Sequence, residues 1–326
     1  MKRKFASLII LATLIVAPVF LAHAQKQPSI PRIGIVRNGT PPDVLLEVFL
    51  QALRDLGYVD GKNILFELRF TEGKSQRSAE LVKELIALKV DAVFAAGGGV
   101  ILAFKQATKT IPMVMVSTTD PIRSGIVSSL AHPGGNITGV SLMASDLWPK
   151  RLELLKEISP KSSRVAIFWN KSNAGMAIEA QATQEAARQM GVALLDRGVK
   201  DPSEIDAVFA AMSKDRPDAF LALMDLSLRE HQTRIIDFLI KNRLPAIFET
   251  KEIVEAGGLV SYGPNLADMY RRAAVHMDKI LKGTKPADIP VEQPMRFEFV
   301  INLKTAKQIG LTIPPNVLVR ADKVIR

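Results

Sequence analysis

Cysteine is absent from the 326-residue chain. Its absence excludes disulfide bonds, cysteine-ligated zinc or iron–sulfur centres, a thiol nucleophile and the cysteine-linked lipid anchor of bacterial lipoproteins. The four histidines stand apart in the sequence, so no metal cluster is expected. The chain also lacks the Gly-x-Ser-x-Gly elbow of hydrolases, and neither a Walker A sequence nor a dinucleotide-binding spacing follows the glycines at 97–99. We therefore predict a protein that holds no metal ion or other cofactor.

Long hydrophobic runs are also scarce, and the one that is present lies at the N-terminus. Lys2, Arg3 and Lys4 precede an apolar stretch over residues 5–22, and Ala22 and Ala24 provide the small residues of a cleavage site. This arrangement is typical of a secretory signal peptide cleaved after Ala24, with a retained membrane anchor as the alternative. Export to the periplasm would separate the protein from nucleic acid. Removing residues 1–24 lowers the formal net charge from +10 to +7, and this mild excess indicates a general preference of exported proteins or attraction of anionic solutes rather than DNA binding.

The remainder of the chain alternates short apolar runs with amphipathic segments, and its length suits two domains. The first half predicts strands at 32–36, 64–70, 91–95 and 113–117, and helices at 44–56, 79–88 and 100–108. Strands and helices that alternate at this spacing predict right-handed βαβ units on a parallel sheet.

The same pattern begins again in the second half. Three segments are echoed there at nearly one offset: 32–38 by 164–170, 90–94 by 217–221, and 111–115 by 244–248. The echoes predict an α/β protein of two similar lobes, each a doubly wound parallel sheet; one large open sheet is the alternative. Helices are predicted at 147–158, 174–190, 203–212, 227–241 and 266–282.

Three short segments are predicted to cross between the lobes as hinge strands: 139–142, 258–263 and 296–301. The helix at 266–282 would then pack back on the first lobe. The predicted organisation is a signal peptide over 1–24, a first lobe over 31–142 plus 263–294, and a second lobe over 143–262 plus 295–326. A hinge of three strands suits opening and closing about a ligand.

Candidate ligand-binding residues follow from the rule that open α/β sheets bind ligands beyond the carboxyl ends of their strands. Helix N-termini at this edge favour a carboxylate, and an acidic side chain there can pair with an ammonium group. Each position equally suits an ordinary helix cap. The candidates are Asn38, Thr40, Gly97, Gly98, Gly99, Ser117, Thr118 and Asp120 in the first lobe, and Asn170, Asp225, Glu249 and Tyr262 in the second.

Several longer segments carry a resemblance to a known family, and they lie at 53–63, 120–121, 132–139, 151–156, 255–264 and 301–306. Along essentially the whole mature chain, the sequence resembles the ABC-transporter substrate-binding proteins of the tryptophan/tyrosine-binding-like group. That group has the type I periplasmic binding protein fold. The resemblance implies a non-catalytic, monomeric receptor that captures a small solute between two closing lobes and presents it to an inner-membrane permease with its ATPase.

The resemblance leaves the solute open. Residues 224–226 differ from the prolines that many relatives carry in this loop. We therefore do not assign the relatives' ligand to this protein. We predict a small carboxylate-bearing solute, an amino acid or related metabolite, with Trp169 and Tyr262 as candidate aromatic walls. The alternatives are a periplasmic ligand-sensing module for a signalling partner and an exported α/β enzyme that uses Asp120 and Glu249 as an acid/base pair.

Overall fold

The computed structural model describes residues 30–72, 74–117, 120–142 and 144–326. The predicted signal peptide lies outside the described residues. Within the part that is described, no helix combines the length and the apolar character needed to cross a membrane. Residues Pro31–Arg326 form one compact unit.

The first sheet contains β1 (Arg32–Arg37), β2 (Leu65–Phe70), β3 (Ala92–Ala96), β4 (Met113–Ser117) and β5 (Ile137–Ser141). All pairs are parallel, in the order β2-β1-β3-β4-β5. The three central strands β1, β3 and β4 are almost wholly buried, as expected for apolar strands covered on both faces.

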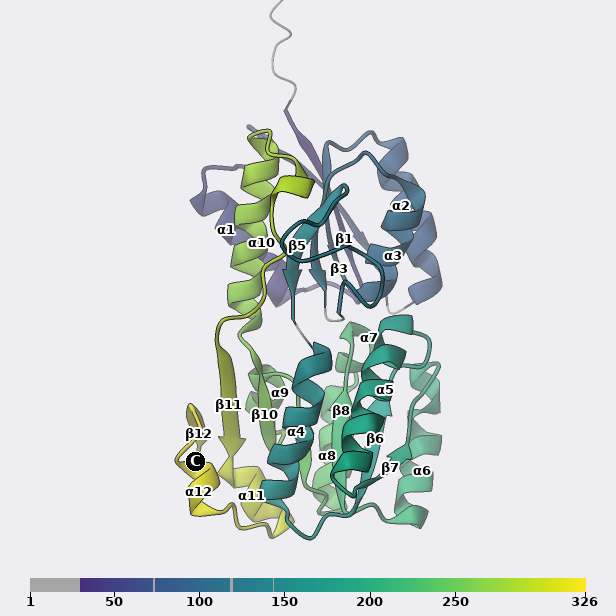
Figure 1. Cartoon of the computed structure of the whole chain (residues 1–326), viewed down its shortest axis with the longest axis vertical. Helices are drawn as coiled ribbons and strands as arrows, with labels where there is room; N and C mark the ends of the chain where they lie inside the picture. The colour runs from purple at the N-terminus through teal and green to yellow at the C-terminus, as the bar shows by residue number, and fades with distance from the viewer. Residues whose placement is uncertain (1–29, 73, 118–119, 143) are drawn as a thin grey trace, which may run out of the picture. The chain divides into compact units, whose positions relative to one another are not determined.

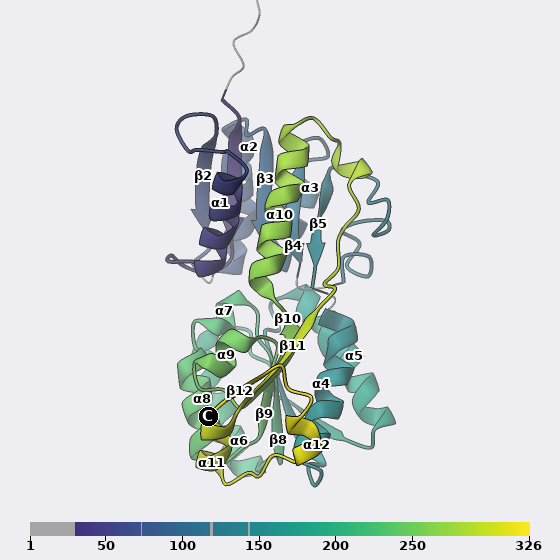
Figure 2. The same cartoon turned by 90° about the vertical axis from the view of Figure 1, so that its left-hand side faces the viewer.

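Helices cover both faces of this sheet: α1 (Val44–Asp55) and α10 (Leu266–Leu281) on one, and α2 (Ser78–Ala87) and α3 (Gly98–Ala107) on the other. A short 3₁₀ turn, η1 (Ser75–Arg77), precedes α2. Alternate residues of each strand face opposite ways, so Val114 packs with α1 and α10, whereas Met113 and Met115 pack with α2 and α3. We call this sheet with its four helices the first lobe (Figures 1 and 2).

The second sheet contains β6 (Arg164–Trp169), β7 (Ala193–Asp196), β8 (Ala219–Leu223), β9 (Ala246–Phe248), β10 (Val260–Pro264), β11 (Phe297–Asn302) and β12 (Lys323–Ile325). Their order is β12-β11-β10-β9-β8-β6-β7, and only the β10–β11 pair is antiparallel among the strands of the described residues. Strands β7-β6-β8-β9-β10 repeat the order of the first sheet, which explains the echoes in the sequence.

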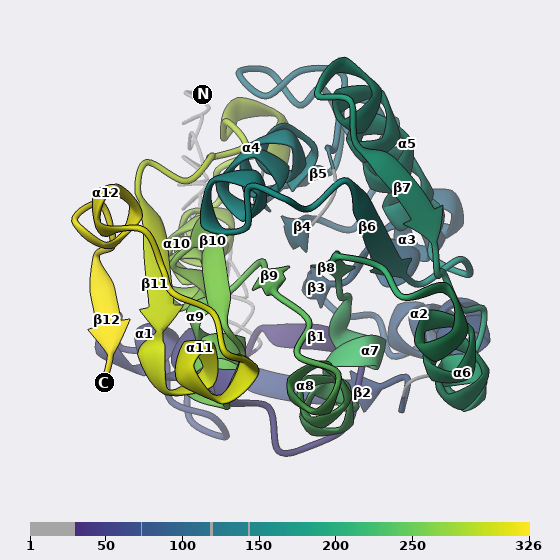
Figure 3. The same cartoon turned by 90° about the horizontal axis from the view of Figure 1, so that it is seen from below.

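One face of the second sheet packs with α4 (Ala144–Ile158), α5 (Ala174–Gln189), α11 (Leu303–Ile309) and α12 (Pro315–Leu318). The other packs with α6 (Ile205–Asp215), α7 (Leu226–Arg229), α8 (Gln232–Lys241) and α9 (Lys251–Glu255). Two further 3₁₀ turns are η2 (Pro202–Glu204) and η3 (Pro286–Asp288). This sheet and its helices form the second lobe, seen end-on in Figure 3.

The predicted α/β class with two doubly wound lobes is confirmed, and the alternative of one large sheet is wrong because the strands form two separate sheets. The chain passes between the lobes three times: between β5 and α4, between β10 and α10, and between η3 and β11 (Figure 2). Two details differ from expectation. The second sheet is mixed, because β11 returns from the first lobe and runs opposite to β10. The helix predicted at 227–241 is interrupted between α7 and α8.

Candidate functional site

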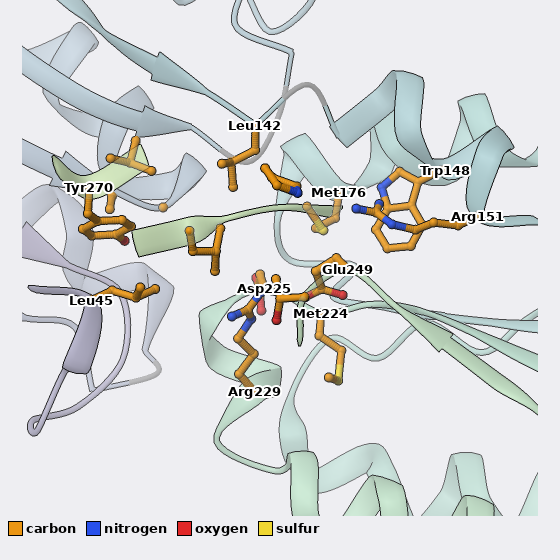
Figure 4. Close-up of a pocket in the computed structure, with 16 residues that line it drawn as sticks. Leu45, Leu142, Trp148, Arg151, Met176, Met224, Asp225, Arg229, Glu249 and Tyr270 are labelled. Atoms are coloured by element: carbon orange, nitrogen blue, oxygen red, sulfur yellow. Dashed lines mark hydrogen bonds and ion pairs between the residues drawn. The ribbon is translucent and has the colours of Figure 1, made fainter. Parts of the chain in front are cut away.

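A cavity with about 670 Å³ of empty space lies between the carboxyl ends of the two sheets (Figure 4). The second lobe lines it with Trp148, Arg151, Met176, Met224, Asp225, Arg229, Glu249, Thr250 and Pro264. The first lobe lines it with Leu45, Ala96, Gly97, Val116, Leu142, Leu266 and Tyr270.

Arg151 on α4 is a buried cation at the second-lobe end of the cavity, with 1% of its surface exposed. Its guanidinium lies 4.0 Å from the centroid of the Trp148 ring, and Nε donates a hydrogen bond to the Tyr262 carbonyl at 2.6 Å. Nη1 has no hydrogen-bond partner among the described residues. Burial lowers the pKa of Arg151 to about 10, against the opposing effect of Glu249 and Glu179. The guanidinium is therefore charged at neutral pH and has a donor to offer.

Glu249 follows β9 and supplies the complementary charge. Oε1 accepts a hydrogen bond from Arg229 Nη2 at 3.0 Å, whereas Oε2 has no partner among the described residues. Burial raises the pKa of Glu249, and the guanidinium groups of Arg229 and Arg151 oppose that rise. The neighbouring Thr250 hydroxyl is likewise buried without a partner in the described part of the chain.

Gly263 allows the backbone of β10 to lie close to the backbone of Glu249. A Cβ atom at this position would lie 1.8 Å from the Glu249 carbonyl oxygen and 3.2 Å from Arg151 Nη2. Only glycine fits between β9 and β10 here.

Asp225 also lines the cavity, but its oxygens are occupied by neutral donors. As the N-cap of α7, it accepts from the Leu228 backbone N–H at 3.2 Å and from the Ser227 hydroxyl at 2.6 Å. The other oxygen accepts from the amides of Asn170 at 2.9 Å and Asn173 at 3.0 Å. Asp225 therefore ties together the loops that follow β6 and β8.

The first-lobe wall depends on a buried arginine behind it. Arg37 has no exposed surface, donates to the Tyr270 hydroxyl and forms an ion pair with Asp43 at 2.6 Å. Although burial lowers the pKa of Arg37, Tyr270 and Asp43 together raise it above its usual value. Asp43 also caps α1 by accepting from the Leu46 N–H at 3.0 Å. This network positions Leu45 and the Tyr270 ring against the cavity.

The predicted candidates fall into three groups. Gly97, Asp225 and Glu249 line the cavity. Asn38, Gly99, Asn170 and again Asp225 line a second, more polar groove. A Cβ atom on Gly98 would lie 3.4 Å from Asn173 Oδ1, so Gly98 sits against the second lobe.

The remaining candidates have other surroundings. Thr40 hydrogen-bonds Glu230 at 3.0 Å, Ser117 ends β4 in the core, and Asp120 caps the turn that follows it. Thr118 lies outside the described residues. The Tyr262 ring stacks on Phe297, with centroids 5.8 Å apart, and packs against the second-lobe core.

The aromatic walls differ from those suggested by the sequence. Trp169 donates its indole N–H to Asp196 at 2.9 Å and does not line the cavity, and the lining rings are Trp148 and Tyr270. Trp148 and Arg151 are three residues apart on a helix, a spacing that places them on one face and was available in the sequence. Tyr270 had no comparable signal, because the predicted return of this helix to the first lobe does not show which of its faces reaches the cavity.

Comparisons with known proteins agree with this architecture. A family model described as ABC transporter substrate binding protein matches residues 42–325. A tyrosine-binding protein from Clostridioides difficile (strain R20291) is 26% identical over 263 residues, which cover 81% of this chain and 75% of that protein.

Two solved structures share the fold. One is an ABC domain in complex with L-Trp from Streptococcus pneumoniae, at 27% identity and a TM-score of 0.83, covering 91% of this chain and all (100%) of that chain. The other is a conserved domain protein from Vibrio cholerae, at 24% identity and a TM-score of 0.85, covering 90% of this chain and 99% of that chain. The two lobes have the predicted type I periplasmic binding protein fold, and the chain belongs to the family of ABC transporter substrate-binding proteins.

Proposed function

We propose that the protein is the exported solute receptor of an ABC importer and binds an α-amino acid or a closely related carboxylate in the cavity between its lobes. One observation carries the proposal. A buried Arg151 donor and a buried Glu249 acceptor both lack a partner among the described residues and line the same largely apolar cavity.

This pair of groups matches the head of an amino acid. A guanidinium binds a carboxylate by charge-assisted hydrogen bonds, and a carboxylate binds an ammonium group in the same way. A buried polar group without a partner costs about 1–3 kcal/mol, so a ligand that satisfies both groups gains affinity. The apolar remainder of the wall then encloses the ligand side chain.

The relatives support this assignment. One is named for binding tyrosine and another was solved with L-Trp, and both ligands have the same α-amino acid head. The mechanism is that of a receptor without catalysis. Because residues of both lobes line the cavity, a ligand that contacts both stabilises the closed arrangement, which the permease and its ATPase then recognise. Export to the periplasm relies on residues 1–24, and the receptor acts as a monomer.

A thermal-shift panel of amino acids, aromatic acids, sugars, nucleosides and polyamines tests the proposal on purified protein that was first partly unfolded to release any carried-over ligand. A ligand that binds only the folded state stabilises it by about 2.7 kcal/mol at a hundredfold excess over Kd. We expect the midpoint to rise most with the concentration of amino acids and less with that of aromatic acids, which share only the carboxylate. A response to sugars or nucleosides, or none at all, would exclude an amino acid receptor.

The variant Glu249→Gln provides the matched arm of the same experiment. It removes the negative partner of the ligand ammonium, so the thermal shift caused by L-phenylalanine should become smaller. 3-Phenylpropionate has no ammonium group, so the thermal shift that it causes should equal that of the wild type. Glu255→Gln is the control, because Glu255 pairs with Lys323 away from the cavity. If the thermal shift became smaller by the same amount for both ligands, Glu249 would not bind the ligand ammonium.

A further inference from the structure

Helix α4 carries two buried hydrogen-bond donors at the cavity, and neither has an acceptor in the described part of the chain. They are the indole Nε1–H of Trp148 and the guanidinium Nη1 of Arg151. The guanidinium lies 4.0 Å from the centroid of the Trp148 ring, so the two side chains are neighbours. Figure 4 shows the nitrogen atoms of both on the side that faces Met176, which also lines the cavity. One small ligand group can therefore contact both donors.

The chemistry of these donors restricts what can bind them. An indole N–H and a guanidinium donate hydrogen bonds and accept none. A ligand group that satisfies both must be an acceptor, and a carboxylate offers two oxygens. An ammonium group has only donors, so it suits Glu249, whose Oε2 atom is buried without a partner among the described residues. The donors on α4 and the acceptor after β9 thus give the two ends of an amino acid head separate partners.

The stacking of Arg151 on Trp148 does not account for the indole N–H. A cation stacks on the face of an aromatic ring, and a ring without a polar atom provides that face as well. Burying a donor without an acceptor is unfavourable. The other tryptophan avoids this cost, because Trp169 Nε1 donates to Asp196 Oδ1 at 2.9 Å, outside the cavity. The Trp148 N–H therefore indicates an acceptor that the ligand brings.

Building on the proposed function, we propose that Trp148 is a ligand-binding residue whose indole N–H donates a hydrogen bond to the ligand carboxylate, beside the guanidinium of Arg151. The carboxylate then lies at α4 and the ammonium group at Glu249. The side chain of the ligand takes no part in this contact, so amino acids with different side chains share it.

The proton NMR spectrum of the purified protein in water tests the bond, because the sequence contains only two tryptophans. Trp169→Phe removes one indole N–H resonance and so assigns the other to Trp148. L-phenylalanine should move the Trp148 resonance downfield and leave that of Trp169 in place. L-leucine should move it in the same direction, which excludes the aromatic ring of the ligand as the cause. If neither binds, the amino acid with the largest thermal shift is the probe.

Trp148→Phe removes the N–H and retains an aromatic face for Arg151. In calorimetric titration, the Kd for L-phenylalanine should rise about ten- to a hundredfold, the range of one hydrogen bond to a charged group. The Kd for 3-phenylpropionate should rise by the same factor, because it has the same carboxylate. Trp169→Phe is the matched control: it loses an indole N–H outside the cavity and should bind both compounds as the wild type does.

The outcomes separate the two proposals. A Trp148 resonance that stays in place when an amino acid binds would overturn the hydrogen bond and leave the amino acid receptor intact, even if Trp148→Phe fails to fold. Equal Kd values in Trp148→Phe and Trp169→Phe would overturn it as well. A loss of affinity confined to L-phenylalanine would show that Trp148 does not bind the carboxylate. A flat response to all amino acids in the thermal panel would overturn the proposed function itself.

Discussion

At the scale of single residues, Asp225 shows how a side chain in a binding cavity can serve the structure first. Its four hydrogen bonds reach the backbone of α7 and the loop after β6, and its side chain is almost entirely buried. Asn170 and Asn173 both depend on it as an acceptor. The carboxylate is thus needed before any ligand arrives.

Replacing Asp225 with alanine should therefore lower the free energy of unfolding by about 2–4 kcal/mol, because it removes a helix cap and leaves two amides without this acceptor. Urea denaturation with an unchanged slope measures the loss. Asp201→Ala is the control, because this exposed carboxylate caps η2 through the Ser203 N–H at 2.9 Å and its loss should cost less than the loss of Asp225. Equal losses in the two variants would show that the Asn170 and Asn173 bonds contribute nothing.

The sequence could predict residues at strand ends better than residues on helices. Gly97, Asp225 and Glu249 were found because the end of a parallel strand fixes where the next residue lies. Arg151, Arg229 and Tyr270 reach the cavity from helices. Which face of a helix turns toward a partner lobe depends on how the two lobes pack, and local periodicity does not contain that information.

At the scale of elements, the segment after η3 is fastened to the first lobe by Glu292. Its backbone pairs with β5, donating to the Gly139 carbonyl and accepting from the Ser141 N–H, both at 2.9 Å. Its carboxylate binds Arg272 through two nitrogens, at 2.6 and 2.5 Å, and lies 3.0 Å from His276 Nε2. Both partners are on α10, so Glu292 joins a strand, a helix and a crossing segment.

This cluster predicts a loss of stability in acid. The hydrogen bond from Arg272 is the main reason that the pKa of Glu292 falls to about 2. Burial lowers the pKa of His276; the positive charges of Lys279 and Arg272 lower it further, and Glu292 opposes the shift. Both folded-state pKa values lie below those of the unfolded chain, so the unfolded state binds more protons as the pH falls. Stability should decline below pH 6.5 through His276 and between pH 4.5 and 2 through Glu292.

Thermal midpoints measured from pH 8 to pH 3 test this. In His276→Gln, the decline between pH 7 and pH 5 should become shallower while the decline below pH 4.5 remains. The exposed His132 provides a control, and His132→Gln should follow the wild type. An unchanged slope in His276→Gln would contradict the assignment.

Elements with strong apolar patterns were predicted closely, and weak or short ones were not. β1, β3, β4 and β6 are buried apolar runs whose ends match the sequence pattern within about two residues. The break between α7 and α8 was missed because apolar spacing continues across Glu230 and His231. β12 and α12 are too short for periodicity to distinguish them from loops.

At the scale of the whole molecule, a hydrogen bond joins the two lobes at the rim. Thr40 Oγ1, after β1, and Glu230 Oε1, between α7 and α8, lie 3.0 Å apart. Neither residue lines the cavity, and both are exposed. The bond therefore contributes to holding the lobes together without contacting a ligand.

Glu230→Ala should raise the Kd for the ligand by about two- to tenfold, because one net hydrogen bond is lost from the closed arrangement. The change should appear mainly in the dissociation rate, measured by stopped-flow fluorescence. Glu230→Gln retains an acceptor oxygen and should lose less. A Kd unchanged in Glu230→Ala would mean that the lobes close without this contact.

The two-lobe organisation was the most predictable feature, because the repeated strand pattern reflects the repeated order β2-β1-β3-β4-β5 and β7-β6-β8-β9-β10. The mixed edge of the second sheet was not predictable in the same way. β11 and β12 have no counterpart in the first sheet, and the direction of β11 follows from the path of the chain between lobes.

The return of α10 to the first lobe affects the order in which the protein can fold. Ile33, Phe94 and Val114 pack under this helix, which the chain supplies only after ten strands have been made. The second lobe likewise waits for β11 and β12. Neither lobe can complete its core while the chain is still being synthesised, so folding must follow synthesis of the C-terminal region. Any fragment that ends before residue 266 leaves an apolar face of the first sheet exposed, and such a face favours aggregation.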